Sequence, residues 1–198
     1  MYTDRKSAIL DAFVNLVKRF GIDKTTMQDV AREVGISVGA IYKDFTNKDE
    51  LIQVYINKMI QSITFDCYQV LEQDKDPKQM LHDLIITFIR KIGENVSRDR
   101  GFIQSLFGNL QIRQKKLQFD DVFEKELQVM IGKILEKGKN EGVFIVENIP
   151  ETAEYFIIAF GVFHLKFVLV EEDLDELMEK VEKMFSFVIR AIEPEPGI

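Results

Sequence analysis

The sequence is poor in the residues that disulfides, metal sites and most catalytic centres require. Its 198 residues include one cysteine (Cys67), two histidines (His82 and His164), four prolines and no tryptophan. One cysteine excludes an internal disulfide and is typical of a reducing compartment. The chain has no H-x-x-x-H, C-x-x-C or glycine-rich phosphate loop, and its cysteine and histidines are far apart in sequence. We therefore expect no metal, no cofactor and no enzymatic activity.

The sequence also has no long apolar run. Its most apolar stretch extends from Tyr155 to Val170 and contains His164 and Lys166, so it is too short and too polar to span a membrane. The first residues lead into an amphipathic helix pattern and do not resemble a signal peptide. We expect a cytoplasmic protein without a membrane partner.

Acidic residues exceed basic ones, but unevenly along the chain. The formal net charge is −7, which argues against a protein that coats nucleic acid without specificity. Residues 1–60 nevertheless carry nine Lys/Arg and eight Asp/Glu, so all the excess acid lies in the remainder. This asymmetry suits a chain with a nucleic-acid-binding part and a separate acidic body.

The most informative stretch extends from Thr25 to Leu51 and predicts two short helices joined by a tight turn. Thr25 is a predicted N-cap, with Gln28 as its capping-box partner. Four apolar residues then follow helical spacing, namely Met27, Val30, Ala31 and Val34. Gly35 allows the positive φ of a sharp turn, Ile36 is a predicted buried anchor in that turn, and Ser37 is placed to cap the next helix.

The second helix of this pair has few apolar residues that must face inward. Only Ile41 and Phe45 are predicted to be buried there. A small residue at Ala31, a glycine at Gly35 and a β-branched residue at Ile41 are typical of a helix-turn-helix. The second helix of such a unit enters the DNA major groove.

The same stretch resembles the DNA-binding domain of the TetR family of bacterial transcription regulators. The resemblance covers Arg5 to Tyr55 and depends on many positions at fixed spacing: Thr25-Thr26, Asp29-Val30-Ala31, Gly35-Ile36-Ser37, Gly39, Ile41-Tyr42, Phe45, Lys48 and Glu50-Leu51. It implies that Thr25 or Thr26, Tyr42 and Lys48 hold DNA phosphates. It further implies that the residues nearest base edges are Ser37, Val38, Gly39, Ala40 and Lys43.

Two of these assignments have alternatives, and two positions depart from the family's common pattern. Lys48 follows the helix-start pair Thr46-Asn47, and it is either a phosphate contact or a solvated lysine. Tyr42 either contacts DNA or packs against the helix that follows. Val38 replaces a frequent polar residue and Asp44 a frequent histidine; Asp44 would accept from a cytosine amine or only avoid phosphate.

The remaining sequence predicts further helices and no strand. Their expected ranges are 4–20, 48–72, 77–96, 97–114 with a bend near Gly108, 119–140, 150–170 and 173–192, with 143–148 as a connector. The predicted fold is all-α with about nine helices. Residues 1–47 form the expected three-helix DNA-binding domain, and residues 48–198 form an effector-binding and dimerisation domain in which 48–72 is the linking helix.

The last two predicted helices carry more apolar surface than one chain of this size can bury. We therefore predict a homodimer, in which they pack against their copies in a four-helix bundle; the alternative is a monomer with one large core. The predicted interface residues are Phe156, Phe160, Phe163, Phe167, Val181, Phe185 and Val188. The family resemblance implies the same interface.

Phenylalanine is abundant in the body, with 16 residues in the whole chain. Aromatic residues at helical spacing are usually plain core, and His164 on its apolar face is equally a core or interface residue. As lining of a ligand pocket we predict Phe88, Ile92, Phe107, Phe123, Phe160 and His164. The predicted function is a dimeric repressor that binds a palindromic operator and is released by a small, largely apolar effector; the alternative is a DNA-binding regulator without such an effector.

Overall fold

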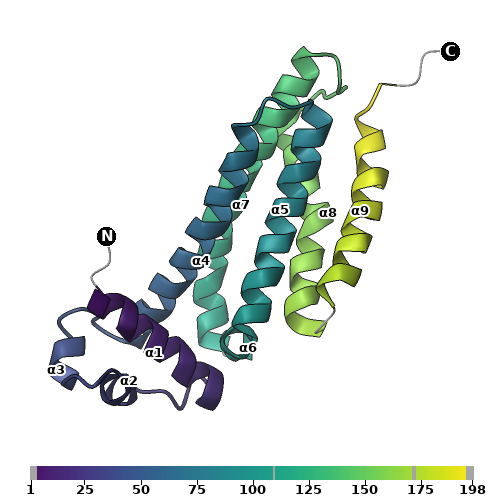
Figure 1. Ribbon diagram of the computed structural model, residues 1–198. Helices are drawn as coiled ribbons and strands as arrows, with labels where there is room; N and C mark the ends of the chain where they lie inside the picture. Colours follow the sequence, from purple (N-terminus) through teal and green to yellow (C-terminus); the bar gives the residue numbers. More distant parts are fainter. Residues whose placement is uncertain (1–3, 109, 171–172, 195–198) are drawn as a thin grey trace. The chain divides into compact units, whose positions relative to one another are not determined.

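The computed structural model describes the backbone of residues 4–108, 110–170 and 173–194, and their side chains except for 107, 110–123 and 164–170. These ranges hold α-helices, one 3₁₀ turn and no strand, so the predicted all-α class is confirmed (Figure 1). The helices are α1 (Asp4–Phe20), α2 (Met27–Val34), α3 (Val38–Ile41), α4 (Lys48–Leu71), α5 (Pro77–Arg98), α6 (Arg100–Gly108), α7 (Leu110–Asn140), α8 (Ile149–Val170) and α9 (Leu174–Val188). The 3₁₀ turn (Ile189–Ala191) follows α9 directly.

The chain forms two compact units that share helices. Unit 1 comprises the described residues of Met1–Gln61 and Asn95–Lys115, and unit 2 those of Ser62–Glu94 and Lys116–Ile198. Helices α4, α5 and α7 each begin in one unit and end in the other. The DNA-binding domain expected over residues 1–47 therefore lies inside a larger compact unit that also contains α6.

The core of unit 1 is formed by α1, α4 and α6. Phe102 of α6 is fully buried, with its ring edge-on to Phe13 of α1 at 5.9 Å between centroids and 4.4 Å from the ring of Tyr55 of α4. A Cβ at Gly101 would lie 3.3 Å from the carbonyl oxygen of Lys18, so α6 approaches the backbone of α1 closely. Phe20, at the last position of α1, is 52% exposed.

Side-chain caps begin α2 and α3 and set the angle between them. The cap of α2 is Thr26, whose hydroxyl accepts from the backbone N–H of Asp29 while the Asp29 carboxylate accepts from the backbone N–H of Thr26. The capping box is therefore one residue later than the pair predicted from sequence. Gly35 ends α2 with φ +74°, and the Ser37 hydroxyl accepts from the Ala40 N–H, both as predicted.

The helices after α4 differ in their boundaries from the sequence prediction. The break falls at Asp99, which separates α5 from α6, and α6 then ends at Gly108. Helix α7 begins at Leu110, nine residues earlier than predicted, because the polar stretch 113–118 continues a helix that apolar spacing alone does not reveal.

In unit 2, helices α5, α8 and α9 lie side by side (Figure 1). The connector after α7 folds back, and the Phe144 ring occupies the space that a Cβ at Gly138 would need. The N–H of Ile145 donates to the carbonyl of Ile192, so this connector is held to the end of the chain and forms no strand pair. Within the described ranges, none of the helices is both long and apolar enough to cross a membrane.

Candidate nucleic-acid interface

Helix α3 and the turn after it present one exposed surface, held from beneath by two residues. Ile41 and Phe45 are buried, as predicted, and Ile36 is half-buried in the turn. The rest of the segment from Ser37 to Lys43 is exposed or half-buried, and Tyr42 is 51% exposed. Because the two anchors fix the helix, the exposed backbone and side chains of α3 form a rigid, convex edge of the size that a major groove admits.

The glycine in this edge is not required by the protein's own packing. A Cβ at Gly39 would meet no heavy atom within 4 Å, and the backbone there does not adopt positive φ. Gly35, in contrast, is required by its left-handed backbone. A helical glycine costs stability relative to alanine, and at Gly39 the packing of the described residues does not account for it.

The turn from α1 to α2 is fixed by one hydrogen bond within the turn and by one to α6. Thr25 is buried, and its hydroxyl donates to the carbonyl of Gly21 at 2.9 Å. The Ile22 N–H donates to the Ser105 hydroxyl of α6 at 2.7 Å. Of the two threonines predicted to hold phosphate, only Thr26 is exposed; Thr25 supports the turn instead.

Lys48, a predicted phosphate contact, also closes this turn. Its ammonium donates to the carbonyls of Ile22 at 2.7 Å and of Thr25 at 3.3 Å. The side chain is half-buried and is not the freely solvated lysine of the alternative interpretation. One structural role is therefore visible, and a phosphate contact would have to use the remaining N–H of the same ammonium.

This double role makes a neutral hydrogen-bond donor the informative substitution at Lys48. We expect Lys48→Gln to keep the fold, to bind all DNA sequences more weakly, and to lower the slope of log affinity against log salt by about 1 per protomer. The measurement is fluorescence anisotropy over a salt series, with Lys58→Gln on the same helix as the control for charge loss. An unchanged slope in Lys48→Gln would leave Lys48 with its structural role alone.

A buried polar cluster joins α1, α4 and the break between α5 and α6. The Asp99 carboxylate accepts from the ammonium of Lys18 at 2.9 Å, from Nε of Arg98 at 3.0 Å and from the hydroxyl of Tyr55. Burial raises the pKa of Asp99, but the three donors outweigh it and the pKa lies below its ordinary value. Burial together with the bond to Asp99 raises the pKa of Tyr55. Since all its groups are paired, the cluster positions helices and offers no reactive group.

The predicted dimer residues are mostly buried within the single chain. Phe156, Phe160, Phe163, Val181 and Phe185 belong to the core, Val188 is half-buried, and the side chain of Phe167 lies outside the described residues. Their contact with a second chain stays a prediction. Among the side chains of these two helices that the structure describes, the large apolar ones that are exposed are instead Tyr155, Ile158 and Val162 of α8 and Phe187 of α9.

The predicted ligand residues are described only in part. Phe88 and Phe160 are buried and Ile92 is half-buried in unit 2. The side chains of Phe107, Phe123 and His164 lie outside the described residues. A pocket lined by these six residues therefore also stays a prediction.

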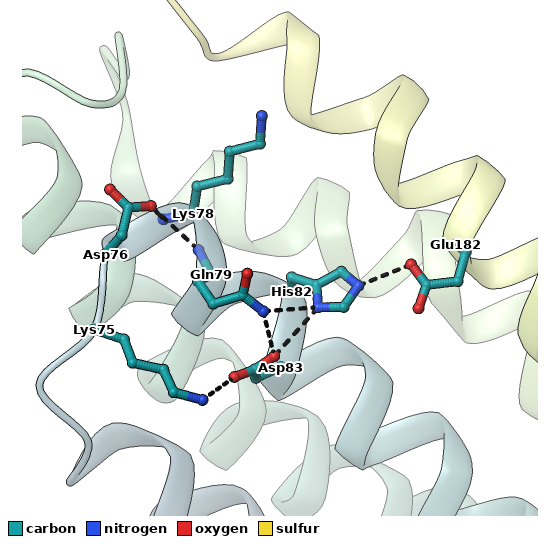
Figure 2. A network of polar contacts seen from close by, with 7 residues as sticks. All are labelled: Lys75, Asp76, Lys78, Gln79, His82, Asp83 and Glu182. Carbon is teal, nitrogen blue, oxygen red and sulfur yellow. Dashed lines mark hydrogen bonds and ion pairs between the residues drawn. The ribbon is translucent and has the colours of Figure 1, made fainter.

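A groove of about 520 Å³ lies elsewhere in unit 2, between the first turns of α5 and the end of α9, and none of the six predicted residues lines it. Figure 2 shows the polar network at this groove. The His82 Nε2 lies 2.8 Å from a carboxylate oxygen of Glu182 on α9, while Asp83 accepts from Lys75 at 2.6 Å and from Gln79 at 2.7 Å.

The polar side chains of this network form hydrogen bonds with one another. Burial raises the pKa of Asp83, but hydrogen bonds from Lys75, Gln79 and His82 outweigh it and lower the pKa overall. The Asp76 carboxylate caps α5 by accepting from the backbone N–H of Lys78. We assign the network a structural role, since it ties α5 to α9.

The helix-turn-helix, with its exposed α3 and its anchored turn, defines a DNA-binding protein of the helix-turn-helix class. Residues 9–55 match the family model described as bacterial regulatory proteins, tetR family. This match assigns residues 9–55 to the DNA-binding domain of TetR-family transcription regulators.

Two curated relatives are similar to different extents. The nicotine-responsive transcriptional repressor HdnoR of Paenarthrobacter nicotinovorans is 27% identical over 85 residues, which are 43% of this chain and 44% of that protein. The chain thus spans less than half of that repressor's length. The nucleoid occlusion factor SlmA of Vibrio campbellii is 23% identical over 143 residues, which are 70% of this chain and 72% of that protein.

The likeness to a solved structure extends over nearly the whole chain. The crystal structure of a TetR transcription regulator from Haloarcula marismortui is 19% identical, with a TM-score of 0.75 over 98% of this chain and 100% of that one. At this identity the likeness concerns the fold alone.

Proposed function

We propose that the chain is a dimeric repressor that reads a palindromic operator through the exposed edge of α3. The observation that carries the proposal is the surface from Ser37 to Lys43, which is anchored by Ile41 and Phe45 and contains a glycine without an internal packing role. Two copies of this edge, related by a two-fold axis, would read two half-sites in successive major grooves. A cytoplasmic location follows from this proposal, because the operator lies there.

The same surface divides into positioning and reading residues. Thr26, Tyr42 and Lys48 hold phosphates and set the register, while Ser37, Val38, Gly39, Ala40 and Lys43 lie nearest the bases. The backbone of Gly39 approaches the DNA more closely than a residue with a Cβ would permit. Val38 contacts a thymine methyl group, since it offers only methyl groups to the groove.

The dimer forms through the exposed face of α8 together with α9. Tyr155, Ile158 and Val162 follow helical spacing on the outside of α8 and are all more than half exposed. A Cβ at Gly161 would meet nothing within 4 Å, so the chain's own core does not require a glycine there. An exposed apolar stripe with a small residue at its edge allows a second helix to approach closely.

A small, largely apolar effector releases the dimer from DNA by shifting the population between two arrangements of the recognition helices. Support comes from the buried aromatic residues of unit 2 and from the relative whose name describes a nicotine-responsive repressor. The alternative is a DNA-binding regulator without an effector. The relative that is a nucleoid occlusion factor favours it, because that name describes no small-molecule response.

The experiment that tests the proposal is selection of bound sequences from a random DNA pool, with the mass of the protein in solution recorded alongside. We expect a palindromic motif bound by a dimer. Enrichment of no motif would overturn the proposal. The recovered operator then serves for a release screen with small aromatic compounds, and release by none of them favours the effector-free alternative.

The matched variant for this experiment is Gly39→Ala. Alanine fits the space and favours a helix, so we expect unchanged or slightly higher thermal stability together with at least about tenfold weaker operator binding. Gly108→Ala is the control, because a Cβ there also meets nothing within 4 Å. Equal operator affinity of Gly39→Ala and the parent protein would contradict the close approach of this backbone.

A further inference from the structure

An acidic residue directly after α3 is paired with the first turn of α1. The Arg5 Nε donates to the Asp44 carboxylate at 2.6 Å, and the two side chains are 51% and 10% exposed. The hydrogen bond from Arg5 lowers the pKa of Asp44 below its ordinary value. The pair joins residues 39 positions apart, so spacing along the chain does not predict it.

The pair uses only one edge of the guanidinium. Among the residues that the structure describes, the contact of Arg5 with Asp44 is made by Nε, and about half of the Arg5 side chain is exposed. Arginine presents five N–H donors in a planar fork, so one edge can hold a carboxylate while the other holds a phosphate. The neighbouring Lys6 is held in the same region, with its ammonium 5.5 Å from the centroid of the Phe45 ring.

An acid beside a DNA-reading edge is unfavourable by its charge alone, since phosphates are repelled. Asp44 follows Tyr42 and Lys43 directly, and its backbone N–H donates to the carbonyl of Ile41 at 2.8 Å, which fixes it against α3. The carboxylate therefore holds Arg5 at a defined place relative to the recognition helix. An unpaired arginine in the first turn of α1 would sample many rotamers and lose that entropy on binding.

We propose that Asp44 is a positioning residue, which orients Arg5 so that its free amino groups bind a DNA phosphate at the edge of the α3 interface. The inference rests on the proposed operator binding. It assigns Asp44 a favourable role in DNA binding despite its charge, where sequence reasoning expected a base contact or avoidance of phosphate.

The test is a double-mutant cycle of Asp44→Ala, Arg5→Ala and the double variant, with the selected operator as the probe. We expect Asp44→Ala alone to weaken operator binding at least fivefold, although it removes a negative charge. In the Arg5→Ala background the same substitution should strengthen binding, because only repulsion between Asp44 and the phosphates then remains. This reversal of sign is the result that a purely repulsive or purely structural Asp44 would not produce.

The salt dependence gives a second readout. Arg5→Ala should lower the slope of log affinity against log salt by about 2 for a dimer, one phosphate per protomer. Asp44→Asn keeps an acceptor oxygen for Arg5 and should recover part of the affinity lost in Asp44→Ala. Glu33→Gln, on the exposed surface of α2, is the control for removal of an acid that does not contact Arg5.

The outcomes separate this inference from the proposed function. If the parent protein binds its operator and Asp44→Ala strengthens binding equally with and without Arg5, then Asp44 only repels DNA. In that case the inference about Asp44 fails, while the proposed operator binding stands. If the parent protein enriches no operator, both fail. Circular dichroism and thermal unfolding of each variant identify any loss of affinity that comes from misfolding. If Asp44→Ala misfolds, the test uses Asp44→Asn instead, and a salt slope equal to that of Arg5→Ala would show that Arg5 no longer contacts the phosphate.

Discussion

Ile158→Asp is expected to dissociate the dimer and to weaken operator binding about 100-fold or more. Ile158 is 64% exposed in the middle of the apolar stripe of α8, so the aspartate is solvated in the monomer and buried only in the dimer. A monomer reads one half-site and loses the effective concentration that the second recognition helix provides. Sedimentation equilibrium and anisotropy with the selected operator measure the two effects.

Ile145→Asp is the matched control. Ile145 is 62% exposed but lies on the connector between α7 and α8, so the same charge should leave both the dimer and the operator affinity unchanged. A charge at Phe185 would be less informative, because Phe185 is buried in its own chain and the substitution would unfold it. An intact Ile158→Asp dimer would remove this face of α8 from the interface.

Asp99→Ala is expected to destabilise unit 1 by about 2 kcal/mol, mainly because it leaves the buried hydroxyl of Tyr55 without its acceptor. Lys18 and Arg98 lose the same acceptor but are partly exposed, so water solvates their charges. Operator affinity should fall with the stability of unit 1, since α1 and α4 carry the helix-turn-helix. Urea unfolding by circular dichroism and hydrogen exchange of the α1 and α6 amides measure the change. Glu176→Ala removes an acid from an exposed pair with Lys180 and should change stability by less than about 0.5 kcal/mol.

The lowered pKa of Asp99 should also make the stability of unit 1 depend on pH in the acidic range. The pKa of Asp99 is below its ordinary value of 3.8 in the folded protein. Its stabilisation is therefore complete above that value and is lost as the pH falls through it toward the folded-state pKa. The stability difference between the parent protein and Asp99→Asn should shrink from pH 6 to pH 3. A constant difference over this range would show that the pKa of Asp99 is the same in the folded and unfolded states.

Local signals predicted the helix-turn-helix well. The turn at Gly35, the cap at Ser37 and the anchors Ile41 and Phe45 follow from residue types that tolerate few alternatives at those positions. The cap of α2 was predicted one residue too early, because two threonines are adjacent. The structure separates them by burial, since Thr25 bonds to Gly21 and Thr26 caps the helix.

Helix α8 is an element in which the spacing of apolar residues does not predict the buried face. It is apolar on nearly every face, so spacing alone could not decide which residues face the core of the same chain. The structure buries Phe156 and Phe160 and exposes Ile158 and Val162. The interface predicted on these helices stays a prediction, and the exposed stripe of α8 lies at positions next to the predicted ones.

The sequence by itself determined the helical class, the position of the helix-turn-helix and the resemblance of this segment to the TetR family, because each depends on short-range spacing and on residues with special backbone or capping chemistry. Only the tertiary structure decided what joins distant positions: Arg5 with Asp44, Lys48 with the turn after α1, and Asp99 with α1 and α4. Such pairs depend on how helices pack, and a charged residue's spacing does not reveal which of many opposite charges folding brings to it.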